Sequence, residues 1–217
     1  MILRPRETQI VDVSKALTIQ RHGRQEWAAV SIAIRHSGKP GDLVARGMIE
    51  DRAMHYSSVI EFTDPAAGKA SEMHASGLRL GSVAGQPLCP MVVVYNAGET
   101  KSTVNLRIPY TSEDGATRSV VLDPIVLAPG EVRELSPEVQ GQTSRLDLDQ
   151  VVSAGVEVVY STAPGTVLAS AQSVSRDGDH VFRAPMVDPQ TKGSAGDYPW
   201  KLDASTSTYI YLKNVTA

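Results

Sequence analysis

Apolar and polar residues in the middle of the chain follow the pattern of β-strands. Residues 91–95 form a short apolar run of the kind that makes a buried strand. Residues 103–110 then alternate strictly, with Val104 and Tyr110 at the two ends of the apolar face. Alternation with one polar face is typical of antiparallel sheets. This region therefore predicts paired antiparallel strands.

Further short strands are predicted along the rest of the chain. Turns rich in proline, glycine and aspartate separate them, and few segments have a helical period. The strands follow one another at spacings of roughly eight to twelve residues, which predicts an all-β fold, an antiparallel β-sandwich of the immunoglobulin-like kind. Their apolar segments are 119–122, 125–127, 132–135, 155–160, 166–174 and 180–182.

The sequence also repeats itself. A displacement of about 124 positions lays residues 1–78 over residues 125–202 without a gap and gives about a dozen identities. A fixed displacement of this kind indicates tandem copies. We expect the shared Asp-Pro pairs to be turns in which the aspartate bonds its own backbone. The shared pairs include Pro40-Gly41 with Pro164-Gly165, and Asp64-Pro65 with Asp188-Pro189.

The copies are out of phase with the ends of the chain. We expect residues 1–80 to be a partial first β-sandwich copy that lacks its opening strands, and residues 81–202 to be a complete copy. Residues 209–214 resemble residues 91–96, so residues 203–217 are expected to be the opening strand of a further copy or a donor strand. The strands expected in the first copy are 7–13, 29–36, 42–50 and 57–62.

Half of a sandwich would expose an apolar face and open strand edges, which natural proteins avoid. Three explanations stay open. The chain is part of a longer tandem protein, or the first copy has fewer strands and packs against the second. Alternatively, another subunit supplies the missing strands, as in donor-strand assembly, for which the segment 205–217 is available.

Composition narrows the function classes. The chain has 217 residues and a net charge of −3, with 21 basic and 24 acidic residues mixed along it, so no basic face for nucleic acid is predicted. No apolar run of about eighteen residues could span a membrane, and no signal peptide is visible. The single cysteine, Cys89, excludes a disulfide framework within the chain and a cysteine-based zinc site. We expect Cys89 to be a small buried hydrophobe rather than a reactive thiol.

Residues that could carry chemistry are scattered. No nucleophile, phosphate-binding or zinc-protease motif occurs, and the five histidines lie apart. Asp147 with Asp149, and Asp177 with Asp179, could offer oxygens to calcium. The counterpart of the second pair in the repeat has no carboxylate, so a solvated turn is the preferred interpretation. We predict no catalytic residue, cofactor or metal, and expect that the chain is not an enzyme.

Four aromatic residues gather near the C-terminal end of a chain that has only 5% aromatics. On a strand, Tyr209 and Tyr211 would share one face, while Ile210 and Leu212 would point to the core. The preferred interpretation is a contact between neighbouring domains, and the alternative is a stacking platform for a carbohydrate. The four residues are Tyr198, Trp200, Tyr209 and Tyr211.

Residues 92–135 resemble the bacterial Ig-like surface domains grouped as cell-adhesion-related, or CARDB-like, domains. The matching features are Val-Tyr-Asn-Ala-Gly-Glu at 94–99, the alternation over 104–108, and Leu-Ala-Pro-Gly-Glu-Val at 127–132. The resemblance implies extracellular tandem β-sandwiches that act as spacers or adhesive modules. It implies no catalytic residues.

These observations predict a non-enzymatic structural or adhesive repeat module of a bacterial surface or filament-forming protein, located at the cell surface or outside the cell. Its expected partners are other copies of itself or neighbouring repeat domains. The alternative is a carbohydrate-binding module of a secreted protein that uses the four aromatic residues and binds polysaccharide.

Overall fold

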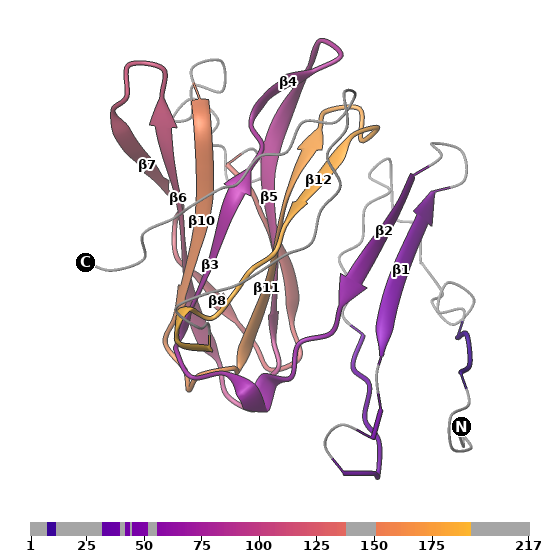
Figure 1. The fold of residues 1–217 in the computed structure, drawn as a ribbon. Helices are drawn as coiled ribbons and strands as arrows, with labels where there is room; N and C mark the ends of the chain where they lie inside the picture. The colour runs from indigo at the N-terminus through magenta and orange to yellow at the C-terminus, as the bar shows by residue number, and fades with distance from the viewer. Residues whose placement is uncertain are drawn as a thin grey trace, which may run out of the picture. The chain divides into compact units, whose positions relative to one another are not determined.

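The computed structural model describes residues 8–11, 32–39, 42–43, 45–51, 56–137 and 151–191, without the side chains of residues 49–51 and 56–61 (Figure 1). The elements in these ranges are antiparallel β-strands and two short 3-10 helices, which confirms the predicted all-β fold. None of the described residues belongs to a helix long and apolar enough to cross a membrane. Residues 1–30 and 31–217 are two compact units, and every element named below lies in the second.

The first sheet of the sandwich has the strand order β3-β10-β6-β7, and β8 also pairs with β6. Val158 of β10 lies opposite Met73 of β3 on one side and Leu106 of β6 on the other. The strands are β3 (Glu72–Leu78), β6 (Ser102–Ser112), β7 (Thr117–Val121), β8 (Ile125–Leu127) and β10 (Val151–Tyr160).

The second sheet has the order β12-β11-β5-β4, and β9 also pairs with β5. Val92 of β5 lies opposite Ala171 of β11 and Leu135 of β9. The chain passes from one sheet to the other between β3 and β4, between β5 and β6, between β8 and β9, between β9 and β10, and between β10 and β11. The strands are β4 (Gly81–Val83), β5 (Gln86–Asn96), β9 (Val132–Leu135), β11 (Val167–Ser175) and β12 (Val181–Ala184).

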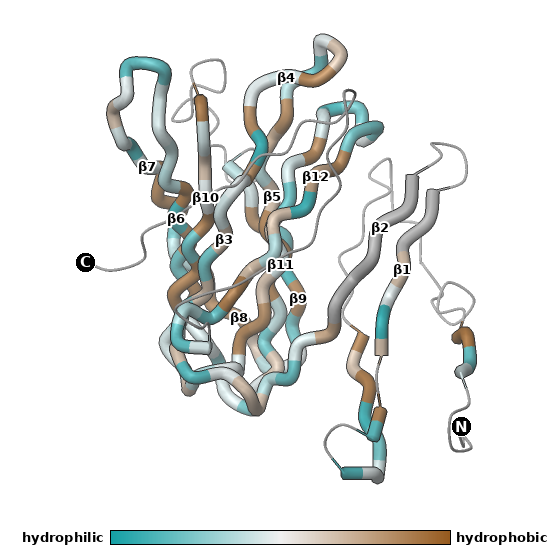
Figure 2. Tube along the Cα trace, viewed as in Figure 1, coloured by the Kyte–Doolittle hydropathy of each residue, from teal (hydrophilic) through white to brown (hydrophobic). Residues whose placement is uncertain are grey.

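The apolar faces of the two sheets form one core. Along β6 every second residue is buried, as the alternation in the sequence predicts. Ile108 of the first sheet and Val92 of the second are both 0% exposed. Burying side chains of this size stabilises a fold by about 1.5–3 kcal/mol each. Figure 2 shows the mixed hydropathy along these strands and the hydrophilic connection between β6 and β7.

The sandwich begins earlier than the sequence predicts. A boundary after residue 80 assigns residues 72–78 to the first copy, whereas these residues form β3, which pairs along β10 and contributes Ala75 and Leu78 to the core. On its other edge, the backbone of His74 exchanges two hydrogen bonds of 2.8 Å with Val187. The predicted boundary therefore falls inside the sandwich, and the sandwich extends back to β3.

The first copy contributes a separate two-stranded sheet. Its strands are β1 (Arg46–Asp51) and β2 (Tyr56–Glu61), which pair antiparallel. They correspond to the strands predicted over 42–50 and 57–62.

Two other strands expected in the first copy are not formed where the structure describes them. Residues 8–11 and 32–36 do not belong to a strand. The apolar side chains of Ile32 and Ile34 are 42% and 46% exposed. Alternating sequence alone does not produce a strand, because the backbone needs a neighbouring strand to pair with.

The hairpin β1–β2 has the same register as the hairpin β11–β12. Gly47 lies opposite Ile60 in the first, and Ala171 lies opposite Ala184 in the second. The displacement found in the sequence converts the first pair into the second. The repeated sequence therefore folds into a repeated hairpin.

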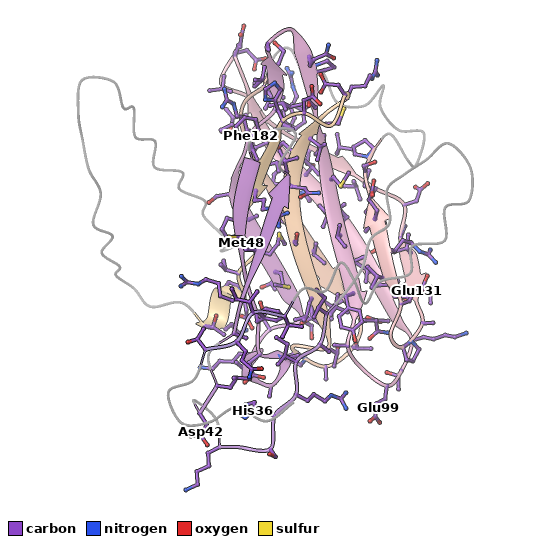
Figure 3. All side chains as sticks on the ribbon, turned by 90° about the vertical axis from the view of Figure 1, so that its right-hand side faces the viewer. His36, Asp42, Met48, Glu99, Glu131 and Phe182 are labelled. Atoms are coloured by element: carbon purple, nitrogen blue, oxygen red, sulfur yellow. The ribbon has the colours of Figure 1, made fainter. Side chains whose placement is uncertain are left out.

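The turn before each hairpin is repeated as well. The Asp42 N–H donates to the Lys39 carbonyl at 3.0 Å, and the Thr166 N–H donates to the Ala163 carbonyl at 3.2 Å. These two bonds are related by the same displacement. Figure 3 shows Asp42, the last residue of this turn in the first copy, and the nearby His36.

A 3-10 helix follows each hairpin, η2 (Pro65–Ala67) after β2 and η5 (Pro189–Thr191) after β12. The Asp64 carboxylate accepts the Ala66 N–H at 2.9 Å, and the Asp188 carboxylate accepts the Gln190 N–H at 2.8 Å. The prediction that both aspartates bond their own backbone is thus confirmed.

Candidate functional site

The turn that closes β5 is built around Asn96, which is 0% exposed. Its Nδ2 donates to the carbonyls of Thr100 at 2.8 Å and Leu127 at 3.1 Å, and its Oδ1 accepts the Gly98 N–H at 3.0 Å. Its carbonyl accepts the Gly130 N–H at 2.9 Å. Asn96 therefore joins the two turn motifs on which the family resemblance rests. Its role here is structural.

The same turn contacts the turn between β10 and β11. The Ala97 N–H donates to the Thr166 carbonyl at 2.8 Å. A Cβ atom at Gly98 would lie 3.1 Å from the Cβ of Thr166. Thr162 and Ser102 place their hydroxyl oxygens 2.9 Å apart. The turns at this end of the sandwich therefore form one packed layer.

Asp188 holds the segment that enters the sandwich. Its Oδ2 accepts the N–H groups of Lys69 at 2.6 Å and Ala70 at 2.9 Å, while its Oδ1 is used by Gln190. Hydrogen bonds to a charged acceptor are stronger than neutral ones. Together with the two backbone hydrogen bonds between His74 and Val187, these bonds hold the segment after β12 (the outgoing segment) against the segment that leads into β3 (the incoming segment). We call this arrangement the clasp; it consists of Lys69, Ala70, His74, Val187 and Asp188.

Tyr160 lies beneath the incoming segment and is 4% exposed. Its hydroxyl donates to the Ala70 carbonyl at 2.9 Å and accepts the Gly165 N–H at 2.8 Å. Gly165 has a φ of +76°, and a Cβ there would lie 1.8 Å from the Pro65 carbonyl oxygen. Only glycine permits this close approach of turn and linker. A side chain at position 165 would force the linker away.

The pKa values of Asp188, in the clasp, and of the neighbouring Tyr160 agree with a structural role for both groups. Burial raises the pKa of the Tyr160 hydroxyl; the Gly165 N–H opposes this rise, and the nearby Asp188 carboxylate adds to it. Burial would also raise the pKa of Asp188, but the N–H groups of Lys69, Ala70 and Gln190 outweigh it, and the pKa is lowered. Near neutral pH Tyr160 is therefore a protonated donor and Asp188 a charged acceptor.

The predicted contact residues Tyr198, Trp200, Tyr209 and Tyr211 lie outside the described residues. The domain-contact and carbohydrate interpretations both stay predictions. The acidic pair Asp147 and Asp149 also lies outside the described residues.

The second acidic pair belongs to the turn after β11. The Ser175 hydroxyl and the Asp179 N–H donate to the Asp177 carboxylate and lower its pKa. Within the described ranges no group of three or more His, Cys, Asp or Glu side chains is placed to hold a metal ion. Cys89, on β5, is half-buried.

Charged and apolar side chains share the solvent-facing side of the first sheet. Arg107 and Glu157 lie 3.4 Å apart, and His74 and Glu72 lie 3.3 Å apart. His74 is buried, whereas Arg107 is exposed, and an ion pair at the surface contributes little to stability. Exposed valines occur on three strands, and some exposed apolar residues are ordinary on a protein surface. They are Val121, Val126, Val152 and Val159.

Sequence reasoning found the turns of this joint but not the contacts between them. The Pro-Gly pair that contains Gly165 and the Asp-Pro pair that contains Asp188 both recur in the first copy. The recurrence of both turns in the first copy was the available signal for a contact between them, because two turns that recur together can contact the same segment. Tyr160 had no such signal, since His36 occupies its place in the first copy.

No protein-family model and no curated protein matches the chain. Solved structures that resemble it include the crystal structure of Thermotoga maritima 1070, which is 13% identical, with a TM-score of 0.33, and covers 55% of this chain and 96% of that one. The X-ray structure of the Northeast Structural Genomics Consortium target SoR45 is 10% identical, with a TM-score of 0.19, and covers 60% of this chain and 96% of that one. Likenesses at this level carry no argument about function. The fold and the clasp define the described part of residues 65–191 as a β-sandwich whose two ends are held together.

Proposed function

We propose that the chain is a non-enzymatic structural or adhesive repeat module of a bacterial surface or filament-forming protein, acting through strand-edge and interdomain contacts. The observation that carries this proposal is the repeated unit of turn, hairpin and 3-10 helix, found around β1–β2 and again around β11–β12. Such units are expected in tandem modules that contact their neighbours in series. Its partners are then other copies of itself or neighbouring repeat domains.

Exposed apolar residues in the first copy support an interfacial role. In the repeat, Ile32 and Ile34 take the positions of Val156 and Val158, which are 0% exposed. The two isoleucines are instead 42% and 46% exposed. Native proteins usually cover apolar side chains and strand edges of this kind. Contact with another module would cover them.

The clasp supports a role for this module in binding neighbouring modules rather than in acting as a spacer between them. Because Asp188 binds Lys69 and Ala70, the chain enters and leaves the sandwich at the same end. A module whose two ends are held together adds little length to a string of modules. A pull on its ends would also break the bonds of the clasp one after another. We therefore assign the module a role in binding its neighbours.

The test is the solution mass of the chain, measured by light scattering over a concentration series, with negative-stain images of the same samples. We expect mass to grow with concentration, and we expect deletion of residues 205–217 to reduce this growth. A variant in which a Gly/Ser sequence of equal length replaces 205–217 is the matched control for chain length. A chain that is monomeric at every concentration contradicts the proposal.

A carbohydrate-binding module is the alternative, supported by the clustering of four aromatic residues near the C-terminal end. Trp200→Ala and Tyr211→Ala should then abolish retention on polysaccharide columns and leave the far-UV circular dichroism spectrum unchanged. Retention equal to that of the parent chain would rule this alternative out.

A further inference from the structure

We propose that the outer face of the second sheet docks against the same face of a second copy of the chain, through a twofold axis that runs parallel to the strands. The outer face consists of the side chains of β5, β9, β11 and β12 that point away from the core. The inference rests on the proposed function, because it names one interface through which the module contacts its own copies. Such a contact is isologous, so each copy contributes the same residues.

The first observation is that β5 is apolar on both of its faces. Val92 and Val94 point into the core and are 0% exposed. Met91, Val93 and Tyr95 alternate with them, so they point outward, and all three are half-buried. A strand with one solvated face usually alternates apolar and polar residues, whereas a near-continuous apolar strand is typical of a sheet covered on both faces. The sequence of β5 therefore favours a covering layer on its outer face.

Neighbouring strands extend this apolar surface. Val174 of β11 lies opposite Cys89 of β5, and Leu168 of β11 lies opposite Tyr95. On the other side of β5, Val132 of β9 also lies opposite Tyr95. Directly paired residues of antiparallel strands lie on the same face, so these half-buried side chains form one surface across three strands. A continuous apolar surface of this kind is typical of an interaction site.

Opposite charges lie at the two edges of the outer face. At one edge, Arg183 of β12 lies opposite Gln172 of β11, which in turn lies opposite Met91 of β5. At the other edge, Glu134 of β9 lies opposite Val93 of β5. The two charges are therefore separated by the width of the sheet and differ by two residues in their position along the strands.

Neither charge has a counter-charge within the ranges that the structure describes, where the ion pairs involve other side chains. The Nε of Arg183 is buried there without a hydrogen-bond acceptor. Burial raises the pKa of Glu134. Both side chains have thus lost hydration without gaining an opposite charge. A partner that brings a carboxylate to one edge and a cation to the other would compensate both charges.

A second copy brings both charges at once, and their positions select one symmetry. Rotation about an axis parallel to the strands, between β5 and β11, exchanges the two edges and keeps each position along the strands. It brings Glu134 of the second copy over Arg183 with an offset of about 7 Å along the strand, which a long side chain can span between sheets about 10 Å apart. The same rotation brings Tyr95 over Leu168. An axis perpendicular to the strands would instead place each edge over itself and bring like charges together.

The test is a charge exchange in the full-length chain, with the dissociation constant of the dimer measured by light scattering over a concentration series. Arg183→Glu and Glu134→Arg each place like charges together twice in the dimer, so each should raise the dissociation constant on the order of tenfold. An equimolar mixture of the two variants restores opposite charges at both sites and should associate as tightly as the parent chain. Arg107→Glu, on the first sheet, is the control, because it changes the net charge equally and lies away from the outer face.

Val93→Lys places a charge at the centre of the outer face and should prevent this association while the sandwich stays folded by circular dichroism. Val121→Lys, on the first sheet, is its control, because Val121 is 54% exposed. If the charge variants and their mixture associate as the parent chain does, the inference is wrong and the proposed function stands. If Val93→Lys lowers the unfolding midpoint in urea without changing association, the chain covers this face itself, which also overturns the inference. A chain that stays monomeric at every concentration contradicts both.

Discussion

The two repeated hairpins, β1–β2 and β11–β12, have the same local structure and different surroundings. The hairpin β11–β12 lies in a five-stranded sheet, and its residues Val167 and Ala171 are at most 2% exposed. In the part of the chain that the structure describes, β1 and β2 pair with each other alone. Local sequence thus determines turn, register and 3-10 helix, whereas burial depends on strands that come from elsewhere.

This difference has a consequence for stability. An isolated two-stranded hairpin is marginally stable in water, because it fixes the backbone and buries little apolar surface. The β11–β12 hairpin is stabilised by pairing with β5 and by the shared core. The β1–β2 hairpin has the same register without that support. A partner that supplied a strand would therefore stabilise the first copy much more than the second.

The largest expected difference in unfolding free energy is between a substitution at Val158 and the same substitution at Ile34, its counterpart in the repeat. Val158→Asp places an unpaired charge in the core, where Val158 is 0% exposed, and should cost more than about 4 kcal/mol of unfolding free energy. Ile34→Asp changes a residue that is 46% exposed and should alter the stability of the sandwich by less than about 0.5 kcal/mol. Urea denaturation followed by circular dichroism measures both.

The same pair of variants also tests the interface. If another module covers Ile34, then Ile34→Asp should reduce association in light scattering while the sandwich stays folded. Equal destabilisation by the two substitutions would show that Ile34 is buried in the chain itself, and the comparison between the copies would fail.

The next effect concerns the close contact between linker and turn. Gly165→Ala should destabilise the sandwich through its positive φ and through a Cβ that would lie 1.8 Å from the Pro65 carbonyl oxygen. Gly115→Ala is the matched control, since Gly115 has a φ of +79° and nothing within 4 Å of the added Cβ. We expect about 1 kcal/mol for Gly115→Ala and at least about 2 kcal/mol more for Gly165→Ala. Equal losses would mean that the linker does not press on the turn in solution.

The sequence predicted what depends on neighbouring residues. Alternation identified β6, and the Asp-Pro pair identified the turn at Asp188, because each has a local pattern. The start of the sandwich has no such pattern, because β3 buries Met73, His74 and Ala75 in succession and does not alternate. The clasp was missed because it joins residues 119 positions apart, Lys69 and Asp188. Such contacts are set by the fold and leave little trace in either segment alone.

A smaller difference in unfolding free energy is expected between substitutions at the two repeated aspartates, Asp188 and Asp64. Asp188→Ala removes three hydrogen bonds, and Asp64→Ala removes one described bond. We expect a loss of about 2 kcal/mol for Asp188→Ala and about 0.5–1 kcal/mol or less for Asp64→Ala, by thermal or urea unfolding. Losses of equal size would indicate that the incoming segment is not fastened by Asp188.

The pH dependence of this contribution has a definite sign. The pKa of Asp188 is lowered in the folded chain from its ordinary value of 3.8, so the folded state favours the charged form. Its stabilising contribution is complete well above pH 3.8 and is lost as the pH falls through the lower, folded pKa. The difference in unfolding free energy between the parent chain and Asp188→Ala should therefore shrink below about pH 4. A difference that grows on acidification would contradict this assignment.

An effect no larger than that of Asp188→Ala is expected at Tyr160, whose hydroxyl connects the segment before β3 to the turn that contains Gly165. Tyr160→Phe keeps the ring packing and removes the donor to the Ala70 carbonyl and the acceptor of the Gly165 N–H. Leaving these backbone groups without their partner should cost about 1–2 kcal/mol, measured by urea unfolding. Tyr110→Phe is the control, because Tyr110 is also buried at 7% exposure and makes no described hydrogen bond through its hydroxyl. If the two substitutions cost the same, the Tyr160 hydroxyl is not the link between linker and turn, and the docking of the linker depends on Asp188 and Gly165.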